Sequence, residues 1–405
     1  MSRYDIENVG FVDFETKALP GASPYDGDVR AAGTYRYVKN AFAIVLTHAI
    51  GWEPVRALTV ENFSSGAMLW EDLPDSMKRH QDRVAKGEAV WCAFNAGFDR
   101  NAWNQSTFDF PTLRPEDMIC AMVQSMTSNL APSLEGASKN IGRAGKQKDG
   151  KYLIQLFCTP GATATPQSHP EEWARFVSYG IQDTEEMREV YASTRQLPPD
   201  EWDDYFISER INERGMELDL HFVERAAAIA ALNNRRINAQ LNRWTNGQIT
   251  AVTQAARIAD YVYDKIEFNE ARDLLVKAYD ENVSTEDADD ADLKPSKLSV
   301  AKDRIEAVLA YYSQLEADGE ELTERDQLIV DVLTARLYGG SSSPAKFDKM
   351  LLQHDDGALR GMYVFNGAQQ TGRFSSKGVQ THNLTRSTLG KYEAEAIELI
   401  NQLEL

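Results

Sequence analysis

Residues 9–16 read VGFVDFET, an apolar run that is interrupted by two carboxylates. Its β-branched and aromatic residues predict a strand, in which alternate side chains point to opposite faces. Asp13 and Glu15 are two residues apart and therefore share one face. Next to apolar neighbours, two such carboxylates repel each other unless a cation lies between them. Taken alone, the motif also fits an edge strand with both acids in solvent.

The residues around this run alternate between strand and helix patterns up to about residue 195. Apolar runs at 43–52 (AIVLTHAIGW) and 89–94 (AVWCAF) predict two further buried strands. Helical patterns follow at 98–105, 121–127, 133–141 and 171–194. The Pro-, Thr- and Gly-rich residues 159–170 predict a loop. This alternation indicates an α/β fold.

A second polar motif, Asn95-x-x-x-Asp99, follows the strand at 89–94 and opens a helix. The pattern predicts that Asp99 lies in the first helical turn, near the ends of the strands. Helix capping by Asn95 or Asp99 is the alternative for this motif alone.

A third motif, Tyr179-x-x-x-Asp183, falls inside the helix predicted at 171–194. Residues four apart share a helix face, so the hydroxyl and the carboxylate are expected to be neighbours. A surface aspartate beside a half-buried tyrosine is the alternative for this pair alone.

In this order the three motifs resemble the DEDD superfamily of proofreading 3′–5′ exonucleases, in its tyrosine-bearing subclass. The resemblance covers roughly residues 9–191. It implies an RNase H-like domain over residues 1–197, with a mixed five-stranded sheet and flanking helices. By this resemblance Tyr179 matches the residue that helps to position the attacking water. The metal-binding carboxylates of the superfamily match Asp13, Glu15, Asp99 and Asp183.

A four-carboxylate set favours hard divalent cations such as Mg²⁺ or Mn²⁺. Two such ions about 4 Å apart would bridge a scissile phosphate, and the product would be a nucleoside 5′-monophosphate. The 3′ end of a single strand would need contacts for its bases, for which Phe14 and Phe98 are candidates, with Asn95 beside them. Core packing is the alternative for both phenylalanines.

From residue 200 the sequence becomes helical, with patterns at 200–214, 220–246, 252–274, 297–316 and 324–337. Residues 209–219 (ERINERGMELD) resemble the entry to the polymerase region of family-A DNA polymerases, the DNA polymerase I family. Residues 367–376 (GAQQTGRFSS) with 380–384 (QTHNL) resemble a later stretch of those enzymes, most closely in bacteriophage members. The resemblance implies a mostly α-helical thumb-like region at 200–340 and an incomplete start of the palm at 341–405. A helix at 346–351 and a strand at 359–365 are predicted within the latter.

The last of these segments carries residue types that suit DNA. Arg373 would donate to a phosphate or to minor-groove acceptors. Further polar groups for the strand backbone are Ser375, Ser376, Gln380, His382 and Asn383. A polar surface hairpin is the alternative. The family has Gln-Asn where this chain has His382-Asn383, which leaves the role of His382 open.

The net charge of −19 argues against a nucleic-acid partner, but the charge is uneven. Between residues 345 and 391 seven Lys or Arg face three Asp, so a local basic patch would hold phosphates. In residues 280–292 seven of thirteen side chains are acidic, which predicts a solvated loop.

The sequence lacks the D-Y-S-x-I/L-E, fingers-helix and H-D-E motifs that family-A polymerases need. We therefore expect a proofreading exonuclease that binds single-stranded 3′ ends and primer–template, without polymerising alone. A second chain would carry the remaining motifs, or the sequence continues. A freestanding exoribonuclease of the RNase D type and a non-catalytic primer–template-binding subunit are the alternatives.

The three cysteines form no CxxC pair, and the histidines show no metal-ligand spacing. This composition predicts a reducing, cytoplasmic environment, in the host cytoplasm for a phage protein. No apolar run approaches 18 residues, so no membrane partner is expected.

Overall fold

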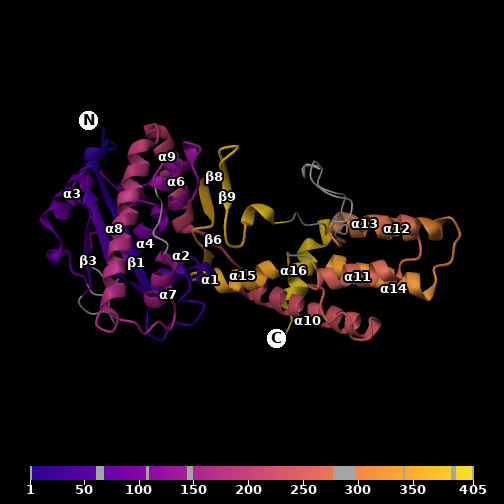
Figure 1. The fold of residues 1–405 in the computed structure, drawn as a ribbon. Helices are drawn as coiled ribbons and strands as arrows, with labels where there is room; N and C mark the ends of the chain where they lie inside the picture. Colours follow the sequence, from indigo (N-terminus) through magenta and orange to yellow (C-terminus); the bar gives the residue numbers. More distant parts are fainter. Residues whose placement is uncertain are drawn as a thin grey trace, which may run out of the picture. The chain divides into compact units, whose positions relative to one another are not determined.

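The computed structural model describes residues 2–60, 68–105, 109–143, 149–276, 298–340, 343–384 and 389–403. The chain divides into two compact units (Figure 1). The first unit comprises Met1–Leu220 and Lys349–Arg386, and the second comprises His221–Asp348 and Ser387–Leu405. The chain therefore leaves the first unit, returns to it and leaves it again.

The first unit is built on a five-stranded sheet in the order β3-β2-β1-β4-β5. The central strand β1 pairs antiparallel with β2 and parallel with β4, so the sheet is mixed, as predicted. The outer strands are short, and their few residues explain why no pattern predicted them. The bounds are β1 Val9–Ala18, β2 Ala41–Ile50, β3 Arg56–Thr59, β4 Val90–Ala93 and β5 Met118–Cys120.

Helices pack on both sides of this sheet. The longest, α8 (Pro170–Ser193), begins with proline at its first position and acidic side chains in its first turn, both of which favour a helix start. The other described helices of residues 1–220 are α1 Val29–Ala32, α2 Thr34–Lys39, α3 Asp75–Ala85, α4 Ala96–Gln105, α5 Ala121–Thr127, α6 Leu134–Asn140, α7 Gly150–Phe157 and α9 Pro199–Arg214. The predicted helices at 98–105, 121–127, 133–141, 171–194 and 200–214 are confirmed to within two residues, whereas α1, α2, α3 and α7 were not predicted.

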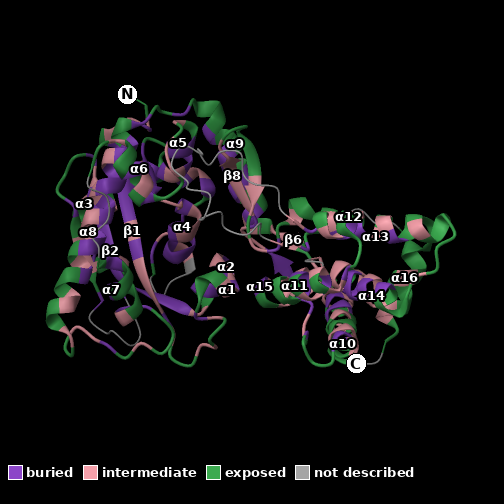
Figure 2. Ribbon diagram, turned by 45° about the vertical axis from the view of Figure 1, so that its right-hand side comes forward, coloured by how far each residue is buried: buried purple, intermediate pink, exposed green. Residues whose placement is uncertain are grey.

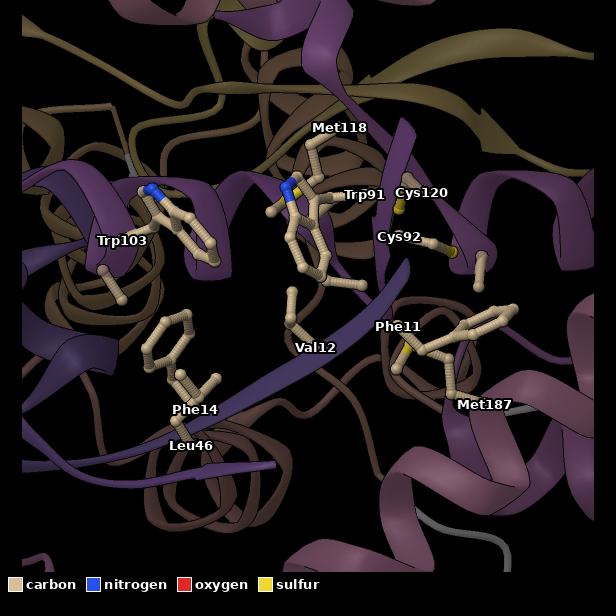
Figure 3. Close-up of a cluster of buried hydrophobic side chains, with 14 of the residues drawn as sticks. Phe11, Val12, Phe14, Leu46, Trp91, Cys92, Trp103, Met118, Cys120 and Met187 are labelled. Carbon is tan, nitrogen blue, oxygen red and sulfur yellow. The ribbon is translucent and has the colours of Figure 1, made fainter. Parts of the chain in front are cut away.

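The two faces of β1 contact different helices. Phe11 packs edge-on against Tyr191 of α8, at a centroid distance of 5.6 Å. Phe14, on the opposite face, packs edge-on against Trp103 of α4 at a centroid distance of 6.3 Å. Figure 3 shows both side chains in the buried cluster. Since Phe14 is only 4% exposed, its ring has no free face on which a base could stack. The structure therefore favours core packing, the alternative, over the expected contact with DNA.

The second unit is helical in its described parts, and buried aliphatic side chains hold it together. Its main bundle contains α10 Leu220–Trp244, α11 Ala255–Lys265, α12 Asn269–Asp273, α13 Lys302–Ala317 and α14 Glu324–Gly339, and α16 Glu393–Asn401 follows later in the chain. One helix was predicted over 252–274, but the chain is extended at Ile266 and Phe268, which separates α11 from α12. The acidic stretch 280–292 lies outside the described residues.

The single strand predicted at 359–365 is instead two strands. β7 (Ala358–Leu359) pairs with β6 (Met216–Glu217), and β8 (Tyr363–Ala368) forms a hairpin with β9 (Arg373–Ser376). The break falls at Gly361, whose φ of +65° is a conformation that strands do not adopt.

None of the helices in the described ranges combines the length and hydrophobicity that crossing a membrane requires. Figure 2 shows that the buried residues of the first unit concentrate in β1, β2 and the helices that cover them.

The core contains a histidine that is held neutral by burial. His80 of α3 is 2% exposed, and its Nε2 donates to the Val90 carbonyl at 3.0 Å. Its ring packs against Trp91, and a Cβ on Gly10 would lie 2.7 Å from its Nε2. Burial lowers the pKa of His80 from 6.5 to about 4.

This pKa predicts a pH-dependent stability. Between pH 6.5 and 4 the unfolded state binds a proton at His80 that the folded state does not, so the free energy of unfolding falls as the pH falls. The expected loss is up to about 3 kcal/mol for this group. Urea unfolding at several pH values between 7 and 4 gives the free energy of unfolding of the wild type and of His80→Phe. The slope of this free energy against pH should be shallower for the variant. His382→Phe, which removes an exposed imidazole of the same unit, is the control, and equal slopes for His80→Phe and the wild type would contradict the assignment.

Candidate active site

The position of α8 on the sheet is determined by a close contact at Gly180. A Cβ on this residue would lie 3.2 Å from Cγ2 of Thr47 in β2. One turn further, the Thr184 and Thr47 hydroxyls are 2.6 Å apart and hydrogen-bonded. Because Thr47 pairs with Asp13 across the β1–β2 ladder, this contact brings α8 over the carboxylate-bearing face of β1.

Tyr179 precedes this contact and is 3% exposed. Its hydroxyl interacts with Asp183, one turn along α8, as the four-residue spacing predicted. Burial and then the negative charges of Asp183 and Glu15 raise its pKa well above 10.0, so the phenol stays protonated and is able to donate. A Cβ on Gly150, at the start of α7, would overlap the Tyr179 ring, so α7 closes directly over it.

Asp99 approaches the same region from the start of α4 and is 2% exposed. Its Oδ1 accepts a hydrogen bond from the backbone N–H of Phe14 at 3.1 Å. Phe14 lies between Asp13 and Glu15 in the sequence, so this bond brings the Asp99 carboxylate to the part of β1 that carries the other two. Burial raises the pKa of Asp99 well above its ordinary value, and the nearby charge of Asp13 raises it further. A cation would relieve this repulsion.

The electrostatic interactions therefore place all five residues of the predicted site in one region, at the meeting of β1, α4 and α8. These residues are Asp13, Glu15, Asp99, Tyr179 and Asp183. Among the described residues, no three His, Cys, Asp or Glu side chains are placed so that they could hold a metal ion. The fit to a hard divalent cation thus rests on the oxygen donors and their mutual repulsion.

Arg100 follows Asp99 in sequence but points away from the carboxylates. Its guanidinium is 2% exposed and pairs with Glu209, at 3.3 Å, and with Glu213, both in α9. The arginine therefore joins α4 to α9 instead of neutralising the site.

A groove of about 610 Å³ opens beside Tyr179. One wall comes from α1 and α2 and includes Arg30 and Tyr37, while α7 supplies Lys151 and Ile154. Sequence reasoning missed this groove, because α1, α2 and α7, which form it, have only four, six and eight residues. The amphipathic pattern of residues 150–157 was the signal that could have found α7.

Asn95 and Phe98 lie at a different pocket, which is lined by residues of β5–α5, α9 and the 361–377 segment. Asn95 has a φ of +73°, so it forms the turn between β4 and α4. Phe98 is half-buried and stacks on Tyr37 at 6.2 Å. Lys377 lines the same pocket, where desolvation of its ammonium group lowers its pKa, although the residue as a whole is exposed.

The predicted DNA-binding residues of the C-terminal segment lie on and after the β8–β9 hairpin. Arg373, His382 and Asn383 are exposed, and the His382 ring packs on Tyr363 at 5.2 Å. The remaining ones are the half-buried Ser375 and Ser376 and the exposed Gln380. Arg360, which the basic patch included, is engaged internally by Asp355 and by the Glu213 carbonyl.

A second basic stretch, which sequence reasoning did not single out, lies on α10 and the residues that follow it. Residues 225–259 contain five arginines and no acidic residue, in a chain of net charge −19. Arg235, Arg236, Arg243 and Arg257 are exposed. The absence of any Asp or Glu over this length was the signal that could have identified it.

No family model matches the chain. Over 402 residues it is 25% identical to the DNA polymerase of Bacillus phage SP02, an alignment that covers 92% of this chain and 53% of that protein. The chain is homologous to a phage DNA polymerase. The homologue spans about half the length of the phage polymerase that it matches.

The fold of this polymerase homologue is similar to that of the POL domain of Pol1 from M. smegmatis, solved with DNA primer-template and dNTP. The TM-score is 0.50 at 11% identity, and the match covers 93% of this chain and 53% of that one. Two clustered mitochondria protein homologs, from Coccidioides immitis (strain RS) and Botryotinia fuckeliana (strain B05.10), are each 26% identical over 62% and 66% of the chain. These matches cover only 19% and 20% of those proteins.

The position of Arg100 predicts a structural role. Arg100→Met leaves two carboxylates of α9 without their partner, and we expect it to lower the free energy of unfolding by about 2–4 kcal/mol. Urea unfolding measures this loss. Arg175→Met, which removes a 49% exposed arginine paired with the 57% exposed Asp149, is the matched control and should cost at most about 1 kcal/mol. Equal losses for the two variants would show that the Arg100 pairs do not hold α4 to α9.

Proposed function

We propose that this chain is a 3′–5′ exonuclease that acts on DNA and belongs to a family-A-like DNA polymerase. The supporting observation is the common location of four carboxylates and a protonated tyrosine on β1, α4 and α8, where Asp13 raises the pKa of Asp99. In this proposal residues 1–197 are an RNase H-like exonuclease domain, 200–340 a thumb-like region and 341–405 the start of a palm. The homology to a phage DNA polymerase supports a polymerase-related role.

The residues of the site divide into ligands and a positioning group. Asp13, Glu15, Asp99 and Asp183 would hold two Mg²⁺ or Mn²⁺ ions, which supply charge stabilisation at the scissile phosphate. Tyr179 would orient the attacking water, because its hydroxyl stays protonated and is held by Asp183. The backbone of α7 at Gly150 packs directly against the Tyr179 ring, where a Cβ would overlap it.

The substrate in this proposal is DNA, with a single-stranded 3′ end at the carboxylates and primer–template on the basic surfaces. The exposed Arg373 segment and the arginines of residues 225–259 provide the positive charge that phosphates require. A second chain that carries the remaining polymerase motifs stays a prediction from the sequence.

The first prediction from this proposal concerns the division of roles. With Mg²⁺ or Mn²⁺ the protein should shorten single-stranded DNA from its 3′ end and release mononucleotides. Asp13→Ala and Asp183→Ala should lose most activity, whereas Tyr179→Phe should lose a factor of about 10 to 100. A 5′-labelled oligonucleotide resolved on a denaturing gel measures all three.

Asp109→Ala, an acidic side chain of the same unit that bonds to the backbone of Trp70, is the control and should retain wild-type activity. Activity that persists in excess EDTA, or digestion from the 5′ end, would refute the proposal. Faster digestion of RNA than of DNA would favour the RNase D type of activity. A Tyr179→Phe variant as inactive as Asp13→Ala would refute the assigned roles.

The second prediction concerns duplex binding. Arg373→Ala should weaken binding to primer–template and lower the slope of log Kd against log salt concentration by about 1, because it removes one phosphate contact. Fluorescence anisotropy over a salt series measures both quantities. Arg56→Ala, which removes an exposed arginine of β3, should change neither. An unchanged salt slope in Arg373→Ala would remove this residue from the DNA-binding surface.

A further inference from the structure

The segment between β1 and β2 forms a wall of the groove beside Tyr179 but contains very little secondary structure. α1 has four residues and α2 has six, and helices of this length are not stable by themselves. Val29 and Arg30 of α1 and Tyr37 of α2 nevertheless line the groove. Contacts from outside the segment must therefore hold this wall in place.

Some of these contacts come from the site side. The Tyr37 hydroxyl bonds to Oγ1 of Thr16 at 2.9 Å, one residue after Glu15 on β1. On its other side Tyr37 stacks on Phe98 of α4. These contacts fix one end of α2 with respect to the carboxylates.

The opposite side of the segment is fastened to residues that lie more than 300 positions away in the chain. Arg36 donates to three carbonyls at the end of α15 (Ala345–Gln353), those of Leu351, Leu352 and His354, at 3.2–3.5 Å. Such carbonyls have no partner within their own helix, and a cation there also favours the helix dipole. The same guanidinium pairs with Asp26 at 2.6 Å.

Lys39, at the end of α2, makes the second attachment. Its Nζ is 2.6 Å from Oδ1 of Asp355 and 2.9 Å from Oδ2 of Asp356. Asp355 is 8% exposed and also pairs with Arg360, whereas Asp356 is 82% exposed. The partly exposed Lys39 therefore pairs with one buried and one exposed carboxylate.

Two uncharged contacts complete the attachment. The Gln353 side chain donates to the Ala31 carbonyl at 3.2 Å. A Cβ on Gly361 would lie 3.0 Å from the Tyr35 ring, so α2 packs directly on the backbone between β7 and β8. The groove wall is thus held by residues 351–361 from one side and by β1 and α4 from the other.

We propose that Arg36 and Lys39 are positioning residues of the groove, and that their attachment to residues 351–356 holds α1 and α2 where they contact the 3′ end of a single strand. Neither side chain touches the carboxylates, so their loss should weaken strand binding and leave the chemical step unchanged. This inference rests on the proposed exonuclease function.

The test uses the full chain and a 5′-labelled single-stranded oligo(dT). Arg36→Met and Lys39→Met keep the apolar stems and remove the charges; together they should raise KM by about tenfold with kcat within about twofold of wild type. Fluorescence anisotropy of the same oligonucleotide in EDTA, where hydrolysis is not expected, should show a matching rise in Kd. Arg114→Met is the control and should alter neither quantity.

A conservative and a charge-reversing variant of Lys39 separate positioning from a general loss of stability. Lys39→Arg, which keeps a positive charge beside Asp355 and Asp356, should leave Kd within about twofold of wild type, whereas Lys39→Glu, which places a like charge beside both, should raise it. A fall in kcat at unchanged KM, an unchanged Kd in the double Met variant, or an equal Kd for Lys39→Arg and Lys39→Glu would each overturn the inference. If the wild type digests no DNA, the proposed exonuclease function fails, while the anisotropy series in EDTA still decides whether the attachment holds the groove.

Discussion

The close packing of α8 on the sheet at Gly180 is the constraint on which the candidate site depends. A Cβ at this position would lie 3.2 Å from Cγ2 of Thr47, so α8 or the Thr47 side chain would have to shift by a few tenths of an ångström. Tyr179 and Asp183 lie on either side of this contact in sequence, and both would move with the helix. Asp99 is fixed independently, by its hydrogen bond to the Phe14 backbone. Two short contacts thus bring groups from three elements into one region, against the repulsion of their charges.

The periodicity of strands and helices made much of this arrangement predictable. The two-residue spacing placed Asp13 and Glu15 on one face, and the four-residue spacing placed Tyr179 beside Asp183. The same alternation puts Phe14 on the opposite face of β1, which explains why it packs in the core. The groove, α1, α2 and β3 could not be predicted, because short elements depend on contacts with distant residues such as Leu352 and His354.

The net charge of −19 does not indicate where this chain could bind DNA, because acidic and basic side chains are unevenly distributed along it. Arg100 and Arg360 lie in stretches that could serve DNA or metal chemistry, yet both are engaged by carboxylates within the first unit. Residues 225–259 contain five arginines and no acidic residue, and several of these arginines are exposed. Whether an arginine is available to bind DNA therefore depends on the carboxylates and carbonyls that its side chain contacts in the folded protein.

The discontinuous first unit has a consequence for the order of folding during synthesis. Residues 349–386 reach the ribosome exit only after residues 221–348 have been made. Until then α2 lacks the carbonyls that Arg36 binds, and β6 lacks its partner β7. The N-terminal residues therefore remain partly folded until residues 349–386 have been synthesised. The contacts that complete the unit join residues far apart in the sequence, so the entropy of closing a long loop opposes them. A nascent chain stalled before residue 349 would expose that state to proteases and chaperones.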